Sequence, residues 1–170
     1  QELGLQNLSL VVNSIGDSTC KPNYLEALRN YYETLLDNLC NDCHNRYQHN
    51  PLRLLDCKQN TCQPYIGNAP RSLDYLCDPC KNHWETLLGY LEHLRIPFNL
   101  DHRLVRGLDY YARTVFEIQP PEEGSQNTIV GGGRYDGLIE QLGGKSTPGV
   151  GFGSGFERII MNLVRQEIKV

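Results

Sequence analysis

Apolar residues in the first forty positions follow two different periods, and each period predicts a different element. Residues 8–13 form a short run rich in β-branched side chains, which is typical of a strand. Asn23 followed by Glu26 has the form of a capping box, and Pro22 is expected to keep a helix from starting earlier. The helix predicted from Asn23 should end near Cys40. Its apolar positions fall on one helical face: Leu25, Leu28, Tyr32, Leu35, Leu36 and Leu39.

A second long helix is predicted after an irregular stretch at residues 40–80. Four X–Pro pairs interrupt that stretch: Asn50-Pro51, Gln63-Pro64, Ala69-Pro70 and Asp78-Pro79. Only a short helix around 72–76 is expected within it. Asp78-Pro79 has the form of an N-cap and a first helical position, so the long helix should open there and end before Ile96-Pro97. Its apolar face consists of Trp84, Leu87, Leu88 and Leu91.

The pattern changes from residue 98 onwards. Short apolar runs alternate with glycine clusters and predict strands at 114–118, 128–130 and 149–153. Residues 134–142 and 155–165 are predicted to be helical. The whole pattern predicts an α/β (α+β) fold, in which an antiparallel sheet with helices carries a helical, cysteine-rich insertion.

Composition and charge exclude several classes of protein. Apolar residues make up 39% of the 170 residues and charged residues 21%, so a packed core is feasible. The net charge is −4, and the sequence lacks a basic tract of the kind that binds nucleic acid non-specifically. No apolar run approaches the roughly 20 residues that span a bilayer, and the first residues lack a signal-peptide pattern. We therefore expect a cytoplasmic protein without membrane contact.

The segment from Leu104 to Glu117 carries candidate binding chemistry. Arg106 is a planar, permanently charged group suited to bidentate contact with phosphate or carboxylate. Tyr110 and Tyr111 offer flat apolar walls with hydroxyl tips, which suit a planar polar heterocycle. The alternative is structural: Arg106 would pair with a local carboxylate such as Asp109, and the tyrosines would be half-buried strand residues.

Two glycine-rich strings follow. Residues 131–138, GGGRYDGL, lie between an apolar strand and a helix, and three adjacent glycines permit close approach of a ligand or another backbone. Residues 149–158, GVGFGSGFER, run from a strand into a helix. They match neither GxGxxG nor GxxxxGK[ST]. Without a ligand, the first string would be a turn and the second a closely packed strand followed by a solvated Arg158.

These strings together resemble the signature of the histidyl-tRNA synthetases, a family of class II aminoacyl-tRNA synthetases, and the match from 104 to 117 is long and gapless. The resemblance implies that Arg106 contacts the carboxylate of bound histidine and the α-phosphate of ATP. It implies that Tyr110 and Tyr111 line the imidazole pocket. It places Gly131, Gly132, Gly133 and Tyr135 around the floor of that pocket. Arg158 occupies the position of the motif 3 arginine, which contacts the γ-phosphate, while Gly153 and Gly155 leave room for adenine and ribose.

The resemblance also implies a domain organisation and partners. Residues 1–19 and 98–170 correspond to part of a catalytic core of the class II type. Residues 20–97, which include the similar string NPLRLLDCK, correspond to a helical insertion that contacts the tRNA acceptor stem. Motifs 1 and 2, the homodimer interface and the anticodon-binding domain would lie outside these residues. We therefore expect L-histidine, ATP with Mg²⁺ and tRNA as ligands of a longer protein, and no synthetase activity from these 170 residues alone.

The cysteines predict a structural zinc site. Six of the seven lie in close pairs, and such spacing suits tetrahedral Zn²⁺. The preferred ligands are Cys40, Cys43, Cys77 and Cys80, which would tie the end of one long helix to the start of the next. Cys57 and Cys62 are the competing pair. His44 and His83 could substitute as ligands but are expected at the surface. Cys20 is expected to be an ordinary core or surface residue. The alternative to a zinc site is a set of reduced, partly buried thiols.

Two other functions compete with the enzyme. A synthetase-like regulatory subunit of ATP phosphoribosyltransferase would keep the fold and the histidine pocket, but such proteins erode the Arg-Gly-Leu-Asp string, which is intact here from Arg106. A zinc-ribbon nucleic-acid module at residues 40–80 is disfavoured by the acidic charge and by the glycine-rich second half.

Overall fold

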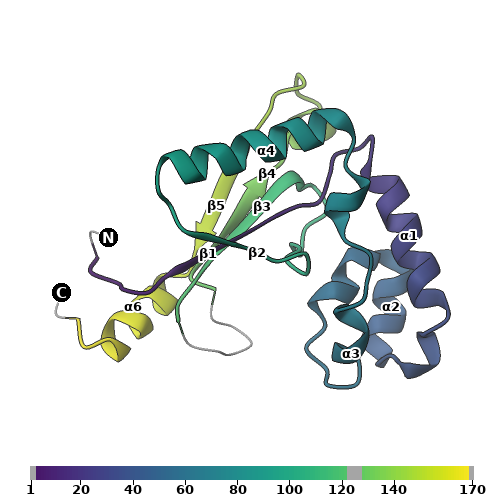
Figure 1. The fold of residues 1–170 in the computed structure, drawn as a ribbon, viewed down its shortest axis with the longest axis horizontal. Coiled ribbons are helices and arrows are strands. Elements are labelled where there is room, and N and C mark those ends of the chain that lie inside the picture. The colour runs from purple at the N-terminus through teal and green to yellow at the C-terminus, as the bar shows by residue number, and fades with distance from the viewer. Residues whose placement is uncertain (1–2, 122–127, 169–170) are drawn as a thin grey trace.

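A five-stranded sheet forms the centre of the computed structural model, which describes residues 3–121 and 128–168 (Figure 1). The strands are β1 (Ser9–Ser14), β2 (Phe98–Leu100), β3 (Ala112–Gln119), β4 (Val130–Arg134) and β5 (Val150–Ser154). Their order across the sheet is β2-β1-β3-β4-β5. β1 and β2 run parallel, and every other neighbouring pair is antiparallel. The predicted fold class, a mixed α/β protein with a mostly antiparallel sheet, is confirmed.

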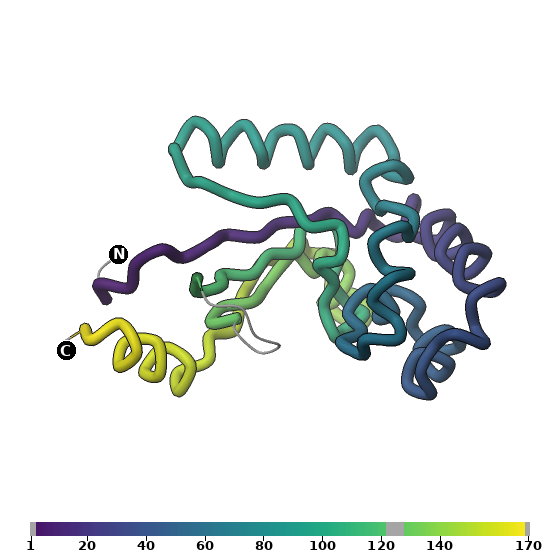
Figure 2. Tube along the Cα trace, turned by 60° about the horizontal axis from the view of Figure 1, so that its bottom comes forward, coloured from purple at the N-terminus to yellow at the C-terminus, as the bar shows by residue number. Residues whose placement is uncertain are grey.

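The helices divide between a lobe beside the sheet and elements on the sheet itself. They are α1 (Lys21–Glu33), α2 (Asn41–His49), α3 (Gln63–Ile66), α4 (Asp78–His93), α5 (Leu138–Gln141) and α6 (Phe156–Arg165). Three 3₁₀ turns join them: η1 (Leu36–Asn38), η2 (Pro51–Asp56) and η3 (Ser72–Tyr75). α1, α2 and α3 form the lobe, α4 lies over one face of the sheet, and α6 lies at the end of the sheet away from the lobe (Figures 1 and 2).

The first helix differs at both ends from its prediction. α1 begins at Lys21 and not at Asn23, because Pro22 occupies the first turn, where a backbone N–H is not needed. It ends at Glu33 and not near Cys40, and η1 continues the chain as a tighter turn. Leu28 and Tyr32 of the predicted face are buried, but the third buried residue of α1 is Tyr24, whereas the predicted Leu25 is half-buried.

The cysteine-rich stretch is more regular than its proline content predicted. Pro51 and Pro64 occupy the first turns of η2 and α3, so they start these elements and do not interrupt them. α4 has Cys77, one residue before the predicted Asp78, as its N-cap.

In the second half of the chain, α5 is shorter than the predicted 134–142, because Arg134 still belongs to β4 and pairs with Asp136.

One continuous core joins the sheet to the lobe. It includes Val115 of β3 and Leu28 of α1, each 0% exposed. The polar contacts across this junction are buried too: the Ser72 hydroxyl donates to the Ser14 carbonyl oxygen at 2.5 Å. Among the described residues, no helix is both long and apolar enough to cross a membrane.

The backbones of β4 and β5 approach each other at Gly132. A Cβ atom added there would lie 2.8 Å from the Cα atom of Phe152 and would also meet the carbonyl oxygen of Gly151. Backbone atoms of a paired strand cannot move aside without breaking the ladder. Gly132 is therefore required by packing, whatever binds nearby.

We expect Gly132→Ala to lower the free energy of unfolding, and the exposed helical substitution Gly89→Ala to raise it. The first forces β4 away from β5, whereas a Cβ at Gly89 meets nothing within 4 Å and gains up to about 1 kcal/mol of helix propensity. Urea unfolding followed by circular dichroism measures both. Equal stability of Gly132→Ala and the unaltered chain would contradict the close approach.

Candidate functional site

A cleft of about 820 Å³ lies between the sheet and the lobe. Strands β3, β4 and β5 form its floor, residues 101–107 form one side, and η2 with the start of α3 forms another. Arg106 and Arg158 both line it. His83 of α4 contacts Thr114, so α4 covers the face to which Thr114 points. Because side chains alternate along a strand, Glu117 points to the opposite face, where the cleft lies.

Arg106 is fixed at the floor of this cleft. Its loop is tied to β1 by Asn13, whose buried side-chain amide donates to the Leu104 carbonyl oxygen at 3.0 Å. The guanidinium Nη1 forms an ion pair with Glu117, and the two side chains are 25% and 15% exposed. A Cβ added at Gly131 would lie 2.6 Å from the Nη atoms, so Arg106 lies on bare backbone.

Arg106 pairs with a carboxylate, as in the structural alternative, but the partner is Glu117 of β3 and not Asp109. The Asp109 carboxylate instead accepts a hydrogen bond from the side-chain amide of Asn50, at the start of η2 in the lobe. The guanidinium of Arg106 is therefore committed to the cleft and not to its own loop.

Glu117 and Thr128 connect the two arginines. The second carboxylate oxygen of Glu117 accepts hydrogen bonds from the Thr128 hydroxyl at 2.6 Å and from the Gln119 amide at 3.0 Å. Arg158 in turn donates from Nη1 to the Thr128 carbonyl oxygen at 2.7 Å. This network holds two positive groups in the cleft, with the Glu117 carboxylate between them. Sequence reasoning did not give Glu117 or Thr128 a role, although Glu117 ends the most informative string.

Three tyrosines cluster next to Arg106. The ring centroids of Tyr110 and Tyr111 are 4.6 Å apart, and Tyr135 packs edge-on against both at 5.9 and 6.5 Å. Tyr111 lies over Gly133, where an added Cβ would be 2.9 Å from its ring. Gly131 and Gly133 share one face of β4, so Arg106 and the tyrosines lie side by side on that face. Hydrogen bonding to Tyr111, followed by burial, raises the pKa of Tyr110, which favours its neutral form.

The remaining predicted positions are placed around the second arginine. Gly153 lines the cleft, and a Cβ there would meet nothing within 4 Å. Gly155, the N-cap of α6, lies against the stem of Arg158, with 3.1 Å between an added Cβ and Cδ. Gly132 faces away from Gly131 and Gly133. The predicted site residues other than Gly132 thus gather on one side of the sheet.

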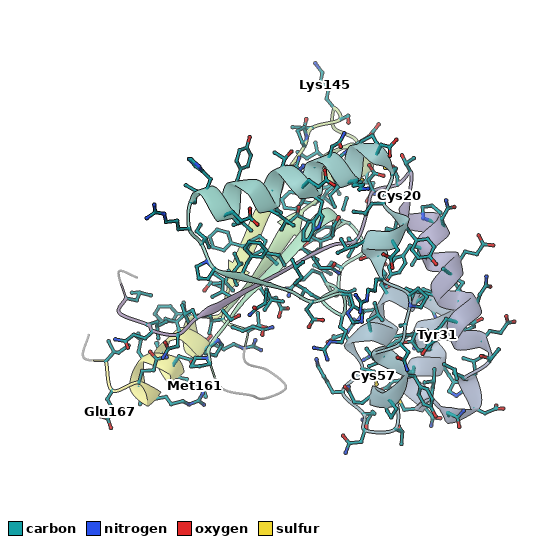
Figure 3. The ribbon with its side chains drawn as sticks, viewed as in Figure 1. Cys20, Tyr31, Cys57, Lys145, Met161 and Glu167 are labelled. Carbon is teal, nitrogen blue, oxygen red and sulfur yellow. The ribbon has the colours of Figure 1, made fainter. Side chains whose placement is uncertain are left out.

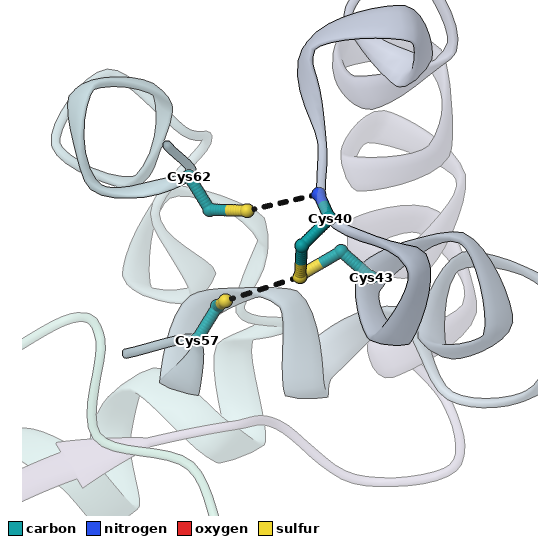
Figure 4. A group of neighbouring side chains, drawn as sticks. All are labelled: Cys40, Cys43, Cys57 and Cys62. Carbon is teal, nitrogen blue, oxygen red and sulfur yellow. Dashed lines mark hydrogen bonds between the residues drawn. The ribbon is translucent and has the colours of Figure 1, made fainter. Parts of the chain in front are cut away.

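Four cysteine thiols converge in the lobe (Figure 4). The Sγ atoms of Cys40, Cys43, Cys57 and Cys62 all lie within 4.8 Å of one another. Backbone N–H groups point at two of them, from Cys40 to the Cys62 sulfur at 3.3 Å and from Gln59 to the Cys57 sulfur at 3.5 Å. We call this group the lobe cluster. Four convergent thiols with N–H donors could hold a metal ion.

The grouping of cysteines preferred from the sequence is corrected by this arrangement. Cys40 and Cys43 meet the competing pair and not Cys77 and Cys80, because α4 begins near the β1–α1 loop, away from the lobe cluster. Cys77 and Cys80 lie instead within 4.8 Å of Asp17 and Cys20. Figure 3 labels one cysteine of each group, Cys20 and Cys57, in separate places. Spacing along the chain could not decide between these pairings.

Neither candidate histidine belongs to a cluster. His44 is exposed, and His83 shares a hydrogen bond of 3.2 Å with the Thr114 hydroxyl. Within the lobe cluster, burial raises the pKa of Cys43 and Cys57. At Cys40 the effect of burial is outweighed by hydrogen bonds from the Cys43 backbone and neighbouring thiols, so its pKa is lowered.

Comparison with known proteins gives a consistent result. A sequence model of the histidyl-tRNA synthetase family matches residues 52–159. A histidine–tRNA ligase of Dehalococcoides mccartyi is 60% identical over 166 residues, which cover 98% of this chain and 40% of the relative. One from Thermotoga petrophila is 55% identical over 170 residues, again 40% of its length. The chain thus spans about 40% of the length of the curated relatives that it matches.

Solved structures agree with the sequence matches. The apo histidyl-tRNA synthetase of S. aureus superimposes with a TM-score of 0.74 at 39% identity, covering all of this chain and 41% of that one. A Bacillus halodurans protein described as an ATP phosphoribosyltransferase regulatory subunit/histidyl-tRNA synthetase has a TM-score of 0.56 at 18% identity and covers 94% of this chain and 45% of that one. At that identity the second match supports the fold alone.

We expect Glu117→Ala to lower the free energy of unfolding by about 1–3 kcal/mol, because it leaves Arg106 and Thr128 without their partner in a half-buried site. Urea unfolding tests this. Asp56→Ala, which removes the more exposed pair with Lys58, is the control and should change stability by less than about 0.5 kcal/mol. A loss of less than about 0.5 kcal/mol for Glu117→Ala, as for the control, would show that the network contributes little to stability.

Proposed function

Because the chain belongs to the histidyl-tRNA synthetase family, we propose that it forms part of an enzyme that activates L-histidine with ATP and transfers it to tRNA. The observation that carries this proposal is the placement of Arg106 and Arg158 in one cleft beside the tyrosine cluster. Positive groups suited to phosphates and an aromatic pocket suited to imidazole are the two halves of a histidyl-adenylate site.

In the proposed reaction the histidine carboxylate attacks the α-phosphate in line, and pyrophosphate leaves. No protein nucleophile is needed, so catalysis consists of positioning and charge stabilisation. Arg106 would contact the carboxylate and the α-phosphate. Its Nη1 is held by Glu117, and a guanidinium has five donors, so others are left for the ligand. Pre-orientation by Glu117 reduces the cost of ordering this long side chain on binding.

Arg158 would hold the leaving pyrophosphate of a Mg²⁺-bound ATP. Its bond to the Thr128 carbonyl oxygen sets the direction of the guanidinium, and α6 carries it on a regular scaffold. The open space at Gly153 suits the adenine and ribose, since a side chain there would project into the cleft. Tyr110, Tyr111 and Tyr135 would surround the imidazole, with Gly131 and Gly133 beneath it.

The whole enzyme's properties extend beyond this chain. Homodimer formation, contact of residues 20–97 with the acceptor stem and a cytoplasmic location stay predictions. A non-catalytic regulatory subunit is the weaker alternative, because the curated relatives named above are ligases up to 60% identical and the Arg-Gly-Leu-Asp string from Arg106 is intact.

We also propose that the lobe cluster binds a structural Zn²⁺. Four cysteine sulfurs satisfy the tetrahedral preference of zinc without leaving an open coordination position. The ligands come from three turns: the start of α2, the end of η2 and the start of α3. Cys57 also lines the cleft, so the metal would fix the lobe side of the site.

In the complete synthetase polypeptide that contains this segment, we expect Arg106→Ala to weaken binding of a non-hydrolysable histidyl-adenylate analogue by about 10- to 100-fold, the loss of a charge-assisted bidentate contact. Histidine-dependent pyrophosphate exchange should fall by at least as much. Calorimetry and the exchange assay provide the two measurements.

Two variants serve as references for this test. Arg106→Lys keeps the charge but loses the planar fork, so it should give an intermediate loss. Arg71→Ala removes an exposed arginine outside the cleft and should leave both quantities unchanged. If Arg106→Ala bound the analogue as tightly as the unaltered enzyme, the proposed site would be wrong.

For the lobe cluster, protein purified without oxygen should contain stoichiometric zinc, and Cys62→Ser should lose one equivalent. Zinc held 1,000-fold above its dissociation constant stabilises the bound form by about 4 kcal/mol, so Cys62→Ser should also unfold at lower urea concentration. Elemental analysis and urea unfolding measure these effects. Thr61→Ser, one residue away and exposed, is the matched control. Absence of stoichiometric zinc would end the proposal.

A further inference from the structure

Asp17, Cys20, Cys77 and Cys80 form a second group of convergent ligands, which we call the junction cluster. A carboxylate oxygen and three Sγ atoms lie within 4.8 Å of one another, where the β1–α1 loop meets the start of α4. Two thiolates on one tetrahedral Zn²⁺ lie about 3.8 Å apart, given Zn–S bonds of about 2.3 Å. The cluster therefore needs only a small contraction to hold a metal ion.

The four groups already point at one another. The thiols of Cys20 and Cys77 donate to the same carboxylate oxygen of Asp17, at 3.6 and 3.8 Å. The backbone N–H of Asp17 donates to the Cys20 sulfur at 3.4 Å. Cys20 and Cys80 are buried, at 4% and 0% exposure, and Cys77 is half-buried. A buried set of thiols around one carboxylate is an arrangement that hydrophobic packing alone does not require.

The local backbone presents these side chains as two short-range pairs. Asp17 and Cys20 lie three residues apart in the turn that leads into α1, and Cys77 and Cys80 lie three residues apart at the start of α4. Cys20 is the N-cap of α1 and Cys77 the N-cap of α4. The positive ends of both helix dipoles therefore face the anionic forms of these ligands.

A fixed cation compensates the charge of the cluster. Arg113 sits at the irregularity in the β3–β4 register, where its φ of +55° places it in the left-handed region. Its backbone N–H donates to the Gly16 carbonyl oxygen at 2.6 Å, and its Nη2 lies 3.4 Å from Asp17. The left-handed backbone conformation of Arg113 thus places its guanidinium beside the Asp17 carboxylate. Three thiolates and a carboxylate carry four negative charges, of which Zn²⁺ and Arg113 would offset three.

We propose that the junction cluster is a second structural zinc site, with Asp17, Cys20, Cys77 and Cys80 as its four ligands. Binding replaces the three thiol protons with metal–sulfur bonds and releases those protons to solvent. The bound ion would join the loop after β1 to α4, and through Arg113 to β3. It would fix the position of the lobe on the sheet, a role independent of both the lobe cluster and the adenylate chemistry.

Metal counting on protein purified without oxygen tests this proposal. We expect two zinc equivalents per chain, falling to one in Cys20→Ser and to one in Cys62→Ser, since each variant disrupts a different cluster. Ser18→Ala lies in the same loop, is exposed and should retain two. A single equivalent in the unaltered chain that is lost with Cys62→Ser but kept with Cys20→Ser would overturn the proposal.

Thiol protection in the unaltered chain gives a second measurement that does not depend on the folding of a variant. Cys20, Cys77 and Cys80 should resist alkylation until a chelator removes zinc, and should then react together, as peptide mass spectrometry would show. Equal alkylation rates at half-buried Cys77 with and without chelator would refute the site. A disulfide among these three cysteines in the oxygen-free preparation would refute it as well.

Discussion

Arg106 rests on the bare backbone of Gly131 and is held there by the carboxylate of Glu117, and this ion pair organises the cleft. Asn13 donates a hydrogen bond to the Leu104 carbonyl oxygen and so holds the loop that carries Arg106. Thr128 contacts the Glu117 carboxylate through its hydroxyl and Arg158 through its carbonyl oxygen, so it links the two arginines. A guanidinium that is partly withdrawn from water and already oriented loses little entropy when a phosphate arrives. The three glycines of β4 serve this arrangement in two ways. Gly131 and Gly133 make room for Arg106 and Tyr111, and Gly132 lets β5 close on the other side.

The lobe reaches its stability in a different way from the sheet. Of its helices, α2 and α3 are short, and prolines stand in the first turns of the 3₁₀ turn η2 (Pro51) and of α3 (Pro64), so helix propensity contributes little there. Buried aromatic residues of α1 attach the lobe to the core, and the two thiol clusters lie inside the lobe and where the lobe leaves the sheet. Cys57 belongs to the lobe cluster and also lines the cleft, which links the integrity of the lobe to the shape of the binding site.

The apolar patterns allowed β1, β3, β5 and α4 to be predicted, whereas β2 (Phe98–Leu100) was not predicted and the strand predicted at 128–130 meets β4 (Val130–Arg134) at one residue only. β1, β3 and α4 lie within one or two residues of the predicted positions. The start of α1 differs from the prediction because Pro22 stands in the first turn of the helix, and α2 has no apolar periodicity to predict it, since Cys43 and Tyr47 are its only apolar residues. The grouping of the cysteines into two clusters could not be predicted from their spacing along the chain, since it depends on which helix ends meet in space. Glu117 and Asp17 carried no spacing signal of their own, and only their neighbours in the fold reveal them.

The adjacency of β1 and β2 has an evolutionary consequence. Leu10 and Phe98 are register partners on parallel neighbouring strands, so the chain leaves the sheet for the lobe and returns to it at the same edge. The lobe between the two strands lies outside the pairing of β3, β4 and β5, so a change in its length does not shift their register. The cleft residues carried by β3, β4 and β5 can therefore keep their positions while the lobe changes, whereas the lobe residues that line the cleft, such as Cys57, change with the lobe.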